Sequence, residues 1–99
     1  MVNQEEVMGI IMHGGNAKSL CLSAMKKLEK REVEEAKALV SEANLELAEA
    51  HKIQTQLIQQ EASGDKVEVT LLMVHAQDHL MNAITVRDLV TSIIIILGN

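Results

Sequence analysis

The chain has 99 residues and a formal net charge of −5, and it contains no Phe, Tyr, Trp or Pro. A chain of this length is expected to form a single domain, residues 1–99, with a modest core. The acidic balance and the lack of aromatic side chains on which bases stack exclude nucleic acid as a partner. A proline-free sequence rich in Ala, Leu, Glu and Lys is typical of an all-α protein.

The first predicted helix covers residues 3–29. We expect the Asn3 side chain to cap it and Glu6, three residues on, to complete a capping box. Gly14 and Gly15 fall in the middle of this helix. Two adjacent glycines there predict either a kink or a close approach of another backbone.

Cys21, the only cysteine, lies in the same helix and has no second thiol with which to form an internal disulfide. It is expected to be a small core residue. Together with the lack of a recognisable targeting segment, it indicates a reducing, cytoplasmic environment. His13 has no partner that its spacing identifies and is expected at the surface.

A second helix is predicted by core positions that alternate steps of three and four residues, the seam of a coiled-coil-like bundle. Its members are Val33, Ala36, Val40, Ala43, Leu47, Ala50, Gln54 and Leu57. Residues 63–65 (Ser-Gly-Asp) end this helix, with Gly64 as its C-terminal cap, and residues 67–69 form a short extended connection. His51, Gln54 and Thr55 form a polar cluster that is either a structural network or support for an active site.

The third predicted helix, residues 70–97, is apolar on too many sides for one bundle. One seam is expected in the core: Leu72, Ala76, His79, Ala83, Val86, Val90, Ile93 and Leu97. A second seam, about 100° round the helix, is formed by Leu71, Val74, Asp78, Met81, Thr85, Asp88, Ser92 and Ile95. A helix that is apolar nearly all round is buried nearly all round, so this helix is predicted to pack against copies of itself. The continuous apolar run, residues 93–97, is too short to span a membrane.

Residues 74–81 (Val-His-Ala-Gln-Asp-His-Leu-Met) carry the chemistry-bearing groups. Residues three and four apart on a helix are neighbours, so His75 lies beside both Asp78 and His79. Three titratable groups buried together are costly unless they are paired, bound to a metal or used in a reaction. We therefore expect the functional site here, with Gln77 as a candidate contact for a bound group.

Three segments together resemble motifs of one family: residues 15–19 (Gly-Asn-Ala-Lys-Ser), residues 49–55 (Glu-Ala-His-Lys-Ile-Gln-Thr) and residues 74–81. The chain resembles the IIA component of the lactose/cellobiose branch, which includes diacetylchitobiose, of the bacterial sugar phosphotransferase system. The resemblance implies an antiparallel three-helix bundle that assembles as a homotrimer through helix three. It also implies a phosphocarrier that accepts a phosphoryl group from the histidine-containing phosphocarrier protein and passes it to a cysteine of the IIB component.

By the same resemblance, His75 is the phosphorylated histidine, through Nε2, and Asp78 is the carboxylate that meets its symmetry mates around a metal ion. Hard oxygen ligands favour Mg²⁺, one ion per trimer. Gln77 is a candidate contact to the phosphoryl group. His79 is either a hydrogen-bonded core histidine or a support for the site.

Two interpretations from other classes stay open at this stage. His75, Asp78 and His79 are spaced somewhat like the ligands of a zinc hydrolase, and the two seams alone would suit a structural oligomerisation module. The family usually joins its first two helices with a Gly-Asp pair, whereas residues 30–32 are Lys-Arg-Glu here. This departure predicts either an altered loop or a local fusion of the two helices.

Overall fold

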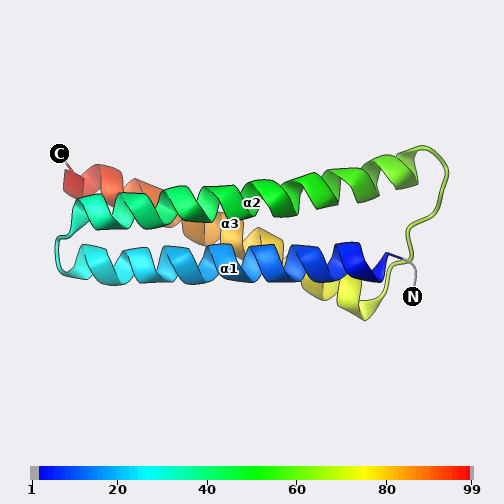
Figure 1. The fold of residues 1–99 in the computed structure, drawn as a ribbon, viewed down its shortest axis with the longest axis horizontal. Coiled ribbons are helices and arrows are strands. Elements are labelled where there is room, and N and C mark those ends of the chain that lie inside the picture. The colour runs from blue at the N-terminus through cyan, green and yellow to red at the C-terminus, as the bar shows by residue number, and fades with distance from the viewer. Residues whose placement is uncertain (1–2, 99) are drawn as a thin grey trace.

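The computed structural model describes residues 3–98 as three helices. These are α1 (Gln4–Glu29), α2 (Val33–Ala62) and α3 (Leu71–Gly98). They form a rod of about 49 × 20 × 15 Å in which α2 runs back along α1 and α3 runs parallel to α1 (Figure 1). No strand occurs between residues 3 and 98. The prediction of an all-α three-helix bundle is confirmed.

Both α1 and α2 end in the same hydrogen-bonded motif. After α2, the amide of Gly64 donates to the carbonyl of Glu61 and the amide of Asp65 donates to that of Gln60. This is the Schellman arrangement, which places its capping residue in the left-handed region, and Gly64 has a φ of 94°. The predicted role of Gly64 is confirmed.

The turn after α1 repeats this motif without a glycine. The amide of Arg31 donates to the carbonyl of Leu28, the amide of Glu32 donates to that of Lys27, and Arg31 has a φ of 63°. The two helices are therefore separated by a tight turn and are not fused. An arginine takes the left-handed conformation that glycine adopts at no steric cost.

The predicted capping box at the start of α1 is wrong. Asn3 itself has a left-handed φ of 67°, and its side chain makes no cap hydrogen bond to α1. Its Nδ2 instead donates to Oε1 of Gln60 at 3.2 Å, which ties the start of α1 to the end of α2. The start of α3, by contrast, has a side-chain cap, since the amide of Met73 donates to Oγ1 of Thr70 at 3.1 Å.

The core is aliphatic and lies between the inner faces of the three helices. Cys21 is fully buried in it, as predicted, and burial raises the pKa of its thiol. The buried residues of α3 are Met73, Ala76, Leu80, Ala83, Val90 and Ile94. This corrects the predicted core seam, because Leu72, His79, Val86, Ile93 and Leu97 lie at its margin and are only half-buried.

Gly14 marks the closest approach between α1 and α3. A Cβ atom placed on Gly14 would lie 3.5 Å from the Cα of Leu80, whereas one placed on Gly15 would meet nothing within 4 Å. The absence of a side chain at Gly14 lets the backbone of α1 lie directly against α3. Of the two alternatives, close contact is therefore the one that the structure shows at Gly14.

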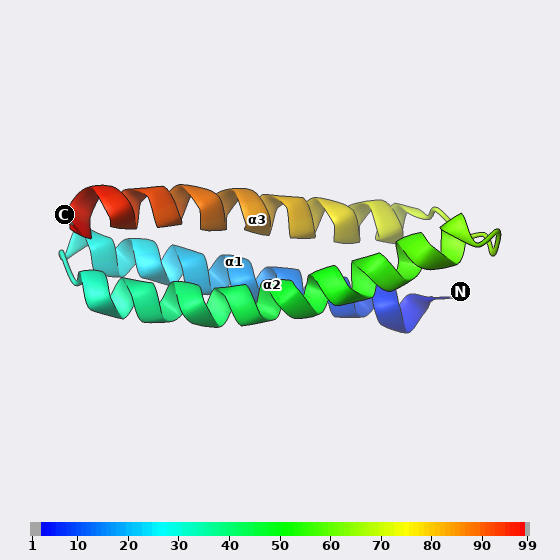
Figure 2. The same cartoon turned by 90° about the horizontal axis from the view of Figure 1, so that it is seen from above.

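α3 runs along one side of the pair formed by α1 and α2 (Figure 2), and its second seam is exposed to solvent. We call it the outer column and define it as the eight residues Leu71, Val74, Asp78, Met81, Thr85, Asp88, Ser92 and Ile95; all eight are exposed. Val74 is 53% exposed and Met81 is 54% exposed. By length and composition, α3 as a whole is long and apolar enough to cross a membrane. The apolar run at residues 93–97 is too short to do so by itself. The prediction that one bundle leaves this face uncovered is confirmed.

Candidate functional site

His75 lies on a flank of α3, between the outer column and the side that packs on α1. Its side chain is exposed, whereas His79, one turn later, is half-buried. The two imidazole rings meet edge to face, with centroids 4.6 Å apart and planes at 84°. The structure therefore confirms the predicted contact between these histidines and leaves His75 open to an incoming group.

The titratable groups of this segment are not buried in the single chain. His75 and Asp78 are both exposed, and no polar or charged residue between positions 3 and 98 counts as fully buried. The expectation that the titratable groups of residues 74–81 are buried together is therefore wrong for a single copy of the chain. The reason is the register of α3, which places Asp78 opposite the core, between Val74 and Met81 on the outer column.

Gln77 lies on the opposite flank of α3 from His75, because side chains two residues apart do not share a helix face. Its Oε1 accepts a hydrogen bond of 2.6 Å from Nε2 of Gln54 on α2. Its own Nε2 meets only the thioether sulfur of Met73, at 3.9 Å. Within one chain, the amide of Gln77 thus points toward α2 and away from His75.

The polar cluster predicted on α2 divides into separate contacts. Gln54 reaches Gln77, whereas His51 is exposed and lines a hollow between α2 and α3 together with Asn44 and Arg87. Arg87 donates to Oδ1 of Asn44 at 2.8 Å. The cluster therefore does not form one network.

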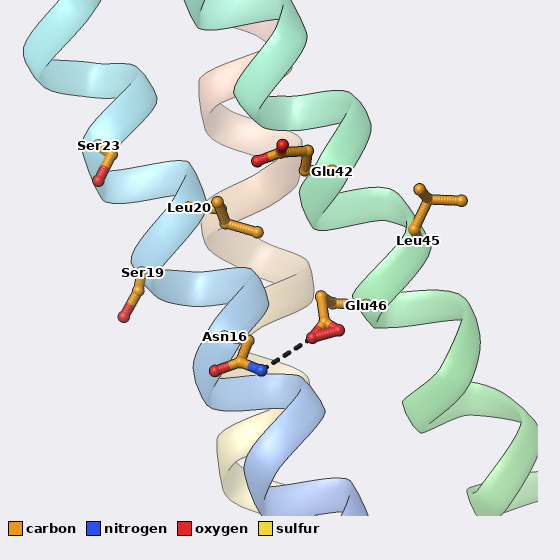
Figure 3. Close-up of a pocket in the computed structure, with 7 residues that line it drawn as sticks. All are labelled: Asn16, Ser19, Leu20, Ser23, Glu42, Leu45 and Glu46. Atoms are coloured by element: carbon orange, nitrogen blue, oxygen red, sulfur yellow. Dashed lines mark hydrogen bonds between the residues drawn. The ribbon is translucent and has the colours of Figure 1, made fainter.

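A second polar group joins α1 to α2 and was not predicted from the sequence. Nδ2 of Asn16 donates to Glu46 at 2.8 Å (Figure 3), and Nδ1 of His13 lies 3.1 Å from the same carboxylate. These two contacts lower the pKa of the Glu46 carboxyl. The expectation that His13 has no partner is wrong, because a pairing between helices leaves no mark in the spacing along either one.

The contacts of Glu46 border an open hollow of about 510 Å³ between α1 and α2. Its other lining residues include Leu20 and Leu45, as Figure 3 shows. None of the residues of segment 74–81 lines it. This hollow is therefore distinct from the site around His75.

The arrangement of side chains between residues 3 and 98 does not support a metal site within a single copy of the chain. Between residues 3 and 98, no three His, Cys, Asp or Glu side chains are grouped so that they could hold an ion. His75, Asp78 and His79 therefore do not form the ligand set that a zinc hydrolase requires. Any metal bound through Asp78 would need carboxylates from other copies of the chain.

Comparison with known proteins places the chain in one family. Residues 5–97 match the family described as "PTS system, Lactose/Cellobiose specific IIA subunit". The lichenan-specific phosphotransferase enzyme IIA component of Bacillus subtilis is 50% identical over 91 residues, which cover 92% of this chain and 83% of that relative. The N,N'-diacetylchitobiose-specific EIIA component of Escherichia coli K12 is 42% identical over 91 residues, covering 92% and 78%.

Solved structures agree with the sequence relatives. The crystal structure of the cellobiose-specific enzyme IIA from Bacillus anthracis superposes with a TM-score of 0.93 at 38% identity, covering 99% of this chain and 90% of that one. The IIA(chitobiose) component in its solution complex with HPr, from Escherichia coli, gives a TM-score of 0.81 at 38% identity, covering 99% and 95%. The chain therefore belongs to the lactose/cellobiose-specific IIA subunit family and is a transferase component of a sugar phosphotransferase system.

Proposed function

We propose that His75 carries the phosphoryl group in this chain. The observation that supports the assignment is the exposure of its imidazole on α3, beside the half-buried ring of His79. The Nε2 lone pair attacks the phosphorus of the phosphohistidine on the donor, the histidine-containing phosphocarrier protein. A P–N bond forms on His75 as the P–N bond of the donor breaks, and the donor imidazole leaves.

The second transfer runs in the same way toward the IIB component. A cysteine thiolate of IIB attacks the phosphorus, an S–P bond forms, and the P–N bond to His75 breaks to regenerate the neutral imidazole. The relative solved in complex with HPr supports the identity of the donor. The sugar itself is not handled by this chain, and similarity to the lichenan-, cellobiose- and diacetylchitobiose-specific components supports a transport system for a sugar of the cellobiose or diacetylchitobiose type.

The assignment of His75 is tested by phosphorylation with enzyme I, the phosphocarrier protein and phosphoenolpyruvate, followed by intact mass. His75→Ala should abolish the gain of one phosphoryl group while the helical circular dichroism is retained. His51→Ala, an exposed histidine on α2, serves as the control and should be phosphorylated normally. Normal uptake by the His75→Ala variant would overturn the proposal.

We propose that the functional assembly is a homotrimer built on the outer column of α3. Exposed Val74, Met81 and Ile95 form an apolar surface along this helix that the single bundle leaves in water. Association removes that surface from water, and oligomerisation is a common remedy for small domains. The same association accounts for the apolar character of α3 without membrane insertion, which supports a cytoplasmic location.

In this trimer, Asp78 would hold a metal ion. The donor chemistry fits, because no residue between Asn3 and Gly98 forms an ion pair or hydrogen bond with its carboxylate, and its neighbours on the outer column are apolar. Three such carboxylates at the axis repel unless a cation lies between them. Hard oxygen ligands favour Mg²⁺, which would supply positive charge at the axis.

The metal proposal is tested by thermal melting with and without a chelator. The unaltered protein should melt at a lower temperature when the chelator is present. Asp78→Leu should lose this dependence and stay at least as stable, because apolar replacement of a buried charge is often neutral or stabilising. Melting that ignores chelator in the unaltered protein, together with much weaker stability of the variant, would contradict the proposal.

A further inference from the structure

The hollow between α1 and α2 combines apolar side chains with two carboxylates. It has a volume of about 510 Å³, and the residues that line it include Leu20, Glu42, Leu45 and Glu46. The side chains of Leu20, Glu42 and Glu46 extend into the space between the two helices, and Leu45 lies at the rim (Figure 3). Leu45 is 71% exposed. An apolar concave surface bordered by polar groups is typical of an interaction site.

The carboxylates of this hollow are not balanced by lysine or arginine. Nearer the turn between the two helices, Nζ of Lys27 lies 3.1 Å from the carboxylate of Glu35. Among the residues that the structure describes, no lysine or arginine lines the hollow, and Glu42 forms neither an ion pair nor a hydrogen bond. Glu46 is ionised at neutral pH, because its hydrogen bonds to α1 lower the pKa of its carboxyl. The hollow therefore favours an occupant that carries positive charge.

The shape of the hollow favours a helix over a small ligand. Its lining on α1 extends from Asn16 to Ser23, a length of about 10 Å at 1.5 Å per residue. Small-molecule pockets enclose most of the ligand surface, whereas this hollow is open. A groove between two packed helices accepts side chains from a third helix. Glu42 and Glu46 are one helical turn apart, so basic side chains four residues apart on that third helix would face them.

We infer that this hollow is a docking site for an amphipathic helix of a partner protein. Apolar side chains of that helix contact Leu20 and Leu45, and its lysine or arginine side chains face Glu42 and Glu46. The inference goes beyond the proposed phosphoryl transfer and does not depend on it, because no residue of segment 74–81 lines the hollow. The hollow lies between α1 and α2, whereas the outer column lies on α3, so the proposed trimer leaves the hollow open. Docking and phosphorylation can then occur on the same subunit.

Two synthetic peptides of about 20 residues, long enough to form a helix in water, probe the hollow. Both carry leucines three and four residues apart along one face. The lysine peptide has lysines four residues apart beside the leucines, and the glutamate peptide has glutamates in the same places. The lysine peptide should bind at least about tenfold more tightly, and NMR chemical shifts should place it at Leu20 and Leu45. Equal affinity for both peptides, or shift changes only on other surfaces, would overturn the inference.

Charge reversal at Glu42 makes the test specific to this hollow. Glu42→Lys should weaken binding of the lysine peptide about tenfold and strengthen binding of the glutamate peptide, because the sign of the local charge changes. Glu68→Lys makes the same change in net charge in the exposed connection before α3 and should leave both affinities unchanged. Equal effects of the two substitutions would show that the lysine peptide responds to net charge alone, which would contradict a site in the hollow.

The apolar part of the site is tested at Leu45. Leu45→Ser should weaken binding of the lysine peptide about tenfold, because less apolar surface is buried, and it should be phosphorylated at the unaltered rate. Sedimentation equilibrium of this variant covers the alternative occupant, a second copy of the chain: an assembly smaller than that of the unaltered protein would overturn the inference. The His75→Ala variant should bind the lysine peptide normally, so failure of docking and failure of the proposed function are distinguishable.

Discussion

Arg31 and Gly64 occupy equivalent positions in the two copies of one helix-ending motif, with φ angles of 63° and 94°. For a residue with a Cβ atom, the left-handed conformation brings that atom close to the following carbonyl oxygen, at a cost of roughly 1–2 kcal/mol. Glycine avoids this cost. The turn between α1 and α2 is therefore less stable than it would be with the glycine that Gly64 supplies after α2.

Replacing Arg31 with glycine should raise the free energy of unfolding by about 1 kcal/mol, since relief of the left-handed strain exceeds the added flexibility of the unfolded chain. Gly64→Ala should lower it by a similar amount, because the space around Gly64 is open and only the backbone is strained. The measurement is chemical denaturation at fixed protomer concentration. Lys30→Gly is the control: Lys30 has a φ of −96°, so glycine there should bring no gain. A destabilised Arg31→Gly variant would contradict this account.

At the level of the helices, the contact between α1 and α3 depends on the size of residue 14. Gly14→Ala should fold with similar or slightly higher stability, because its Cβ would make an ordinary contact at 3.5 Å with Leu80 and alanine favours the helix. Gly14→Leu should lose about 1–3 kcal/mol, since the larger side chain must push α3 away. Thermal melts of both variants, with Gly15→Leu as the matched control in open space, measure the difference. Equal stability of Gly14→Leu and Gly15→Leu would show that close packing at Gly14 is unimportant.

The helices were predictable from the sequence because their signals are local. Ser63, Gly64 and the period of the apolar residues in α2 predicted an end that the structure places at Ala62. The register of α3 was not predictable in the same way. A helix that is apolar on most sides gives two seams of similar strength, and packing against α1 and α2, including the close approach of α1 at Leu80, selects which residues enter the core.

The candidate site shows the same division. The contact between His75 and His79 was predictable because a spacing of four residues is a local feature of one helix. The hydrogen bonds from Asn3 to Gln60 and from Asn16 to Glu46 join residues far apart in the chain. Such pairs depend on how α1 and α2 are aligned, and no spacing within either helix encodes that alignment.

For the whole molecule, association through the outer column can be tested at Met81. Met81→Lys should shift the protein from trimer to monomer in sedimentation equilibrium at micromolar concentration, because three unpaired charges would be buried near one axis. Leu45→Lys is the matched control: Leu45 is 71% exposed on α2, beside the hollow that faces away from the outer column. That variant should remain trimeric. A monomeric unaltered protein would contradict the proposed assembly.

The direction of α3 gives the rod two unequal ends. His75 lies in the second turn of this 28-residue helix, next to the connection from α2, and Gly98 lies at the far end. At 1.5 Å per residue the two positions are about 35 Å apart along the axis. A fluorescent label or a surface tether attached at the Gly98 end would therefore stand clear of the proposed phosphorylation site at His75. Carriers immobilised in this way should exchange phosphoryl groups with partners in solution as rapidly as free ones.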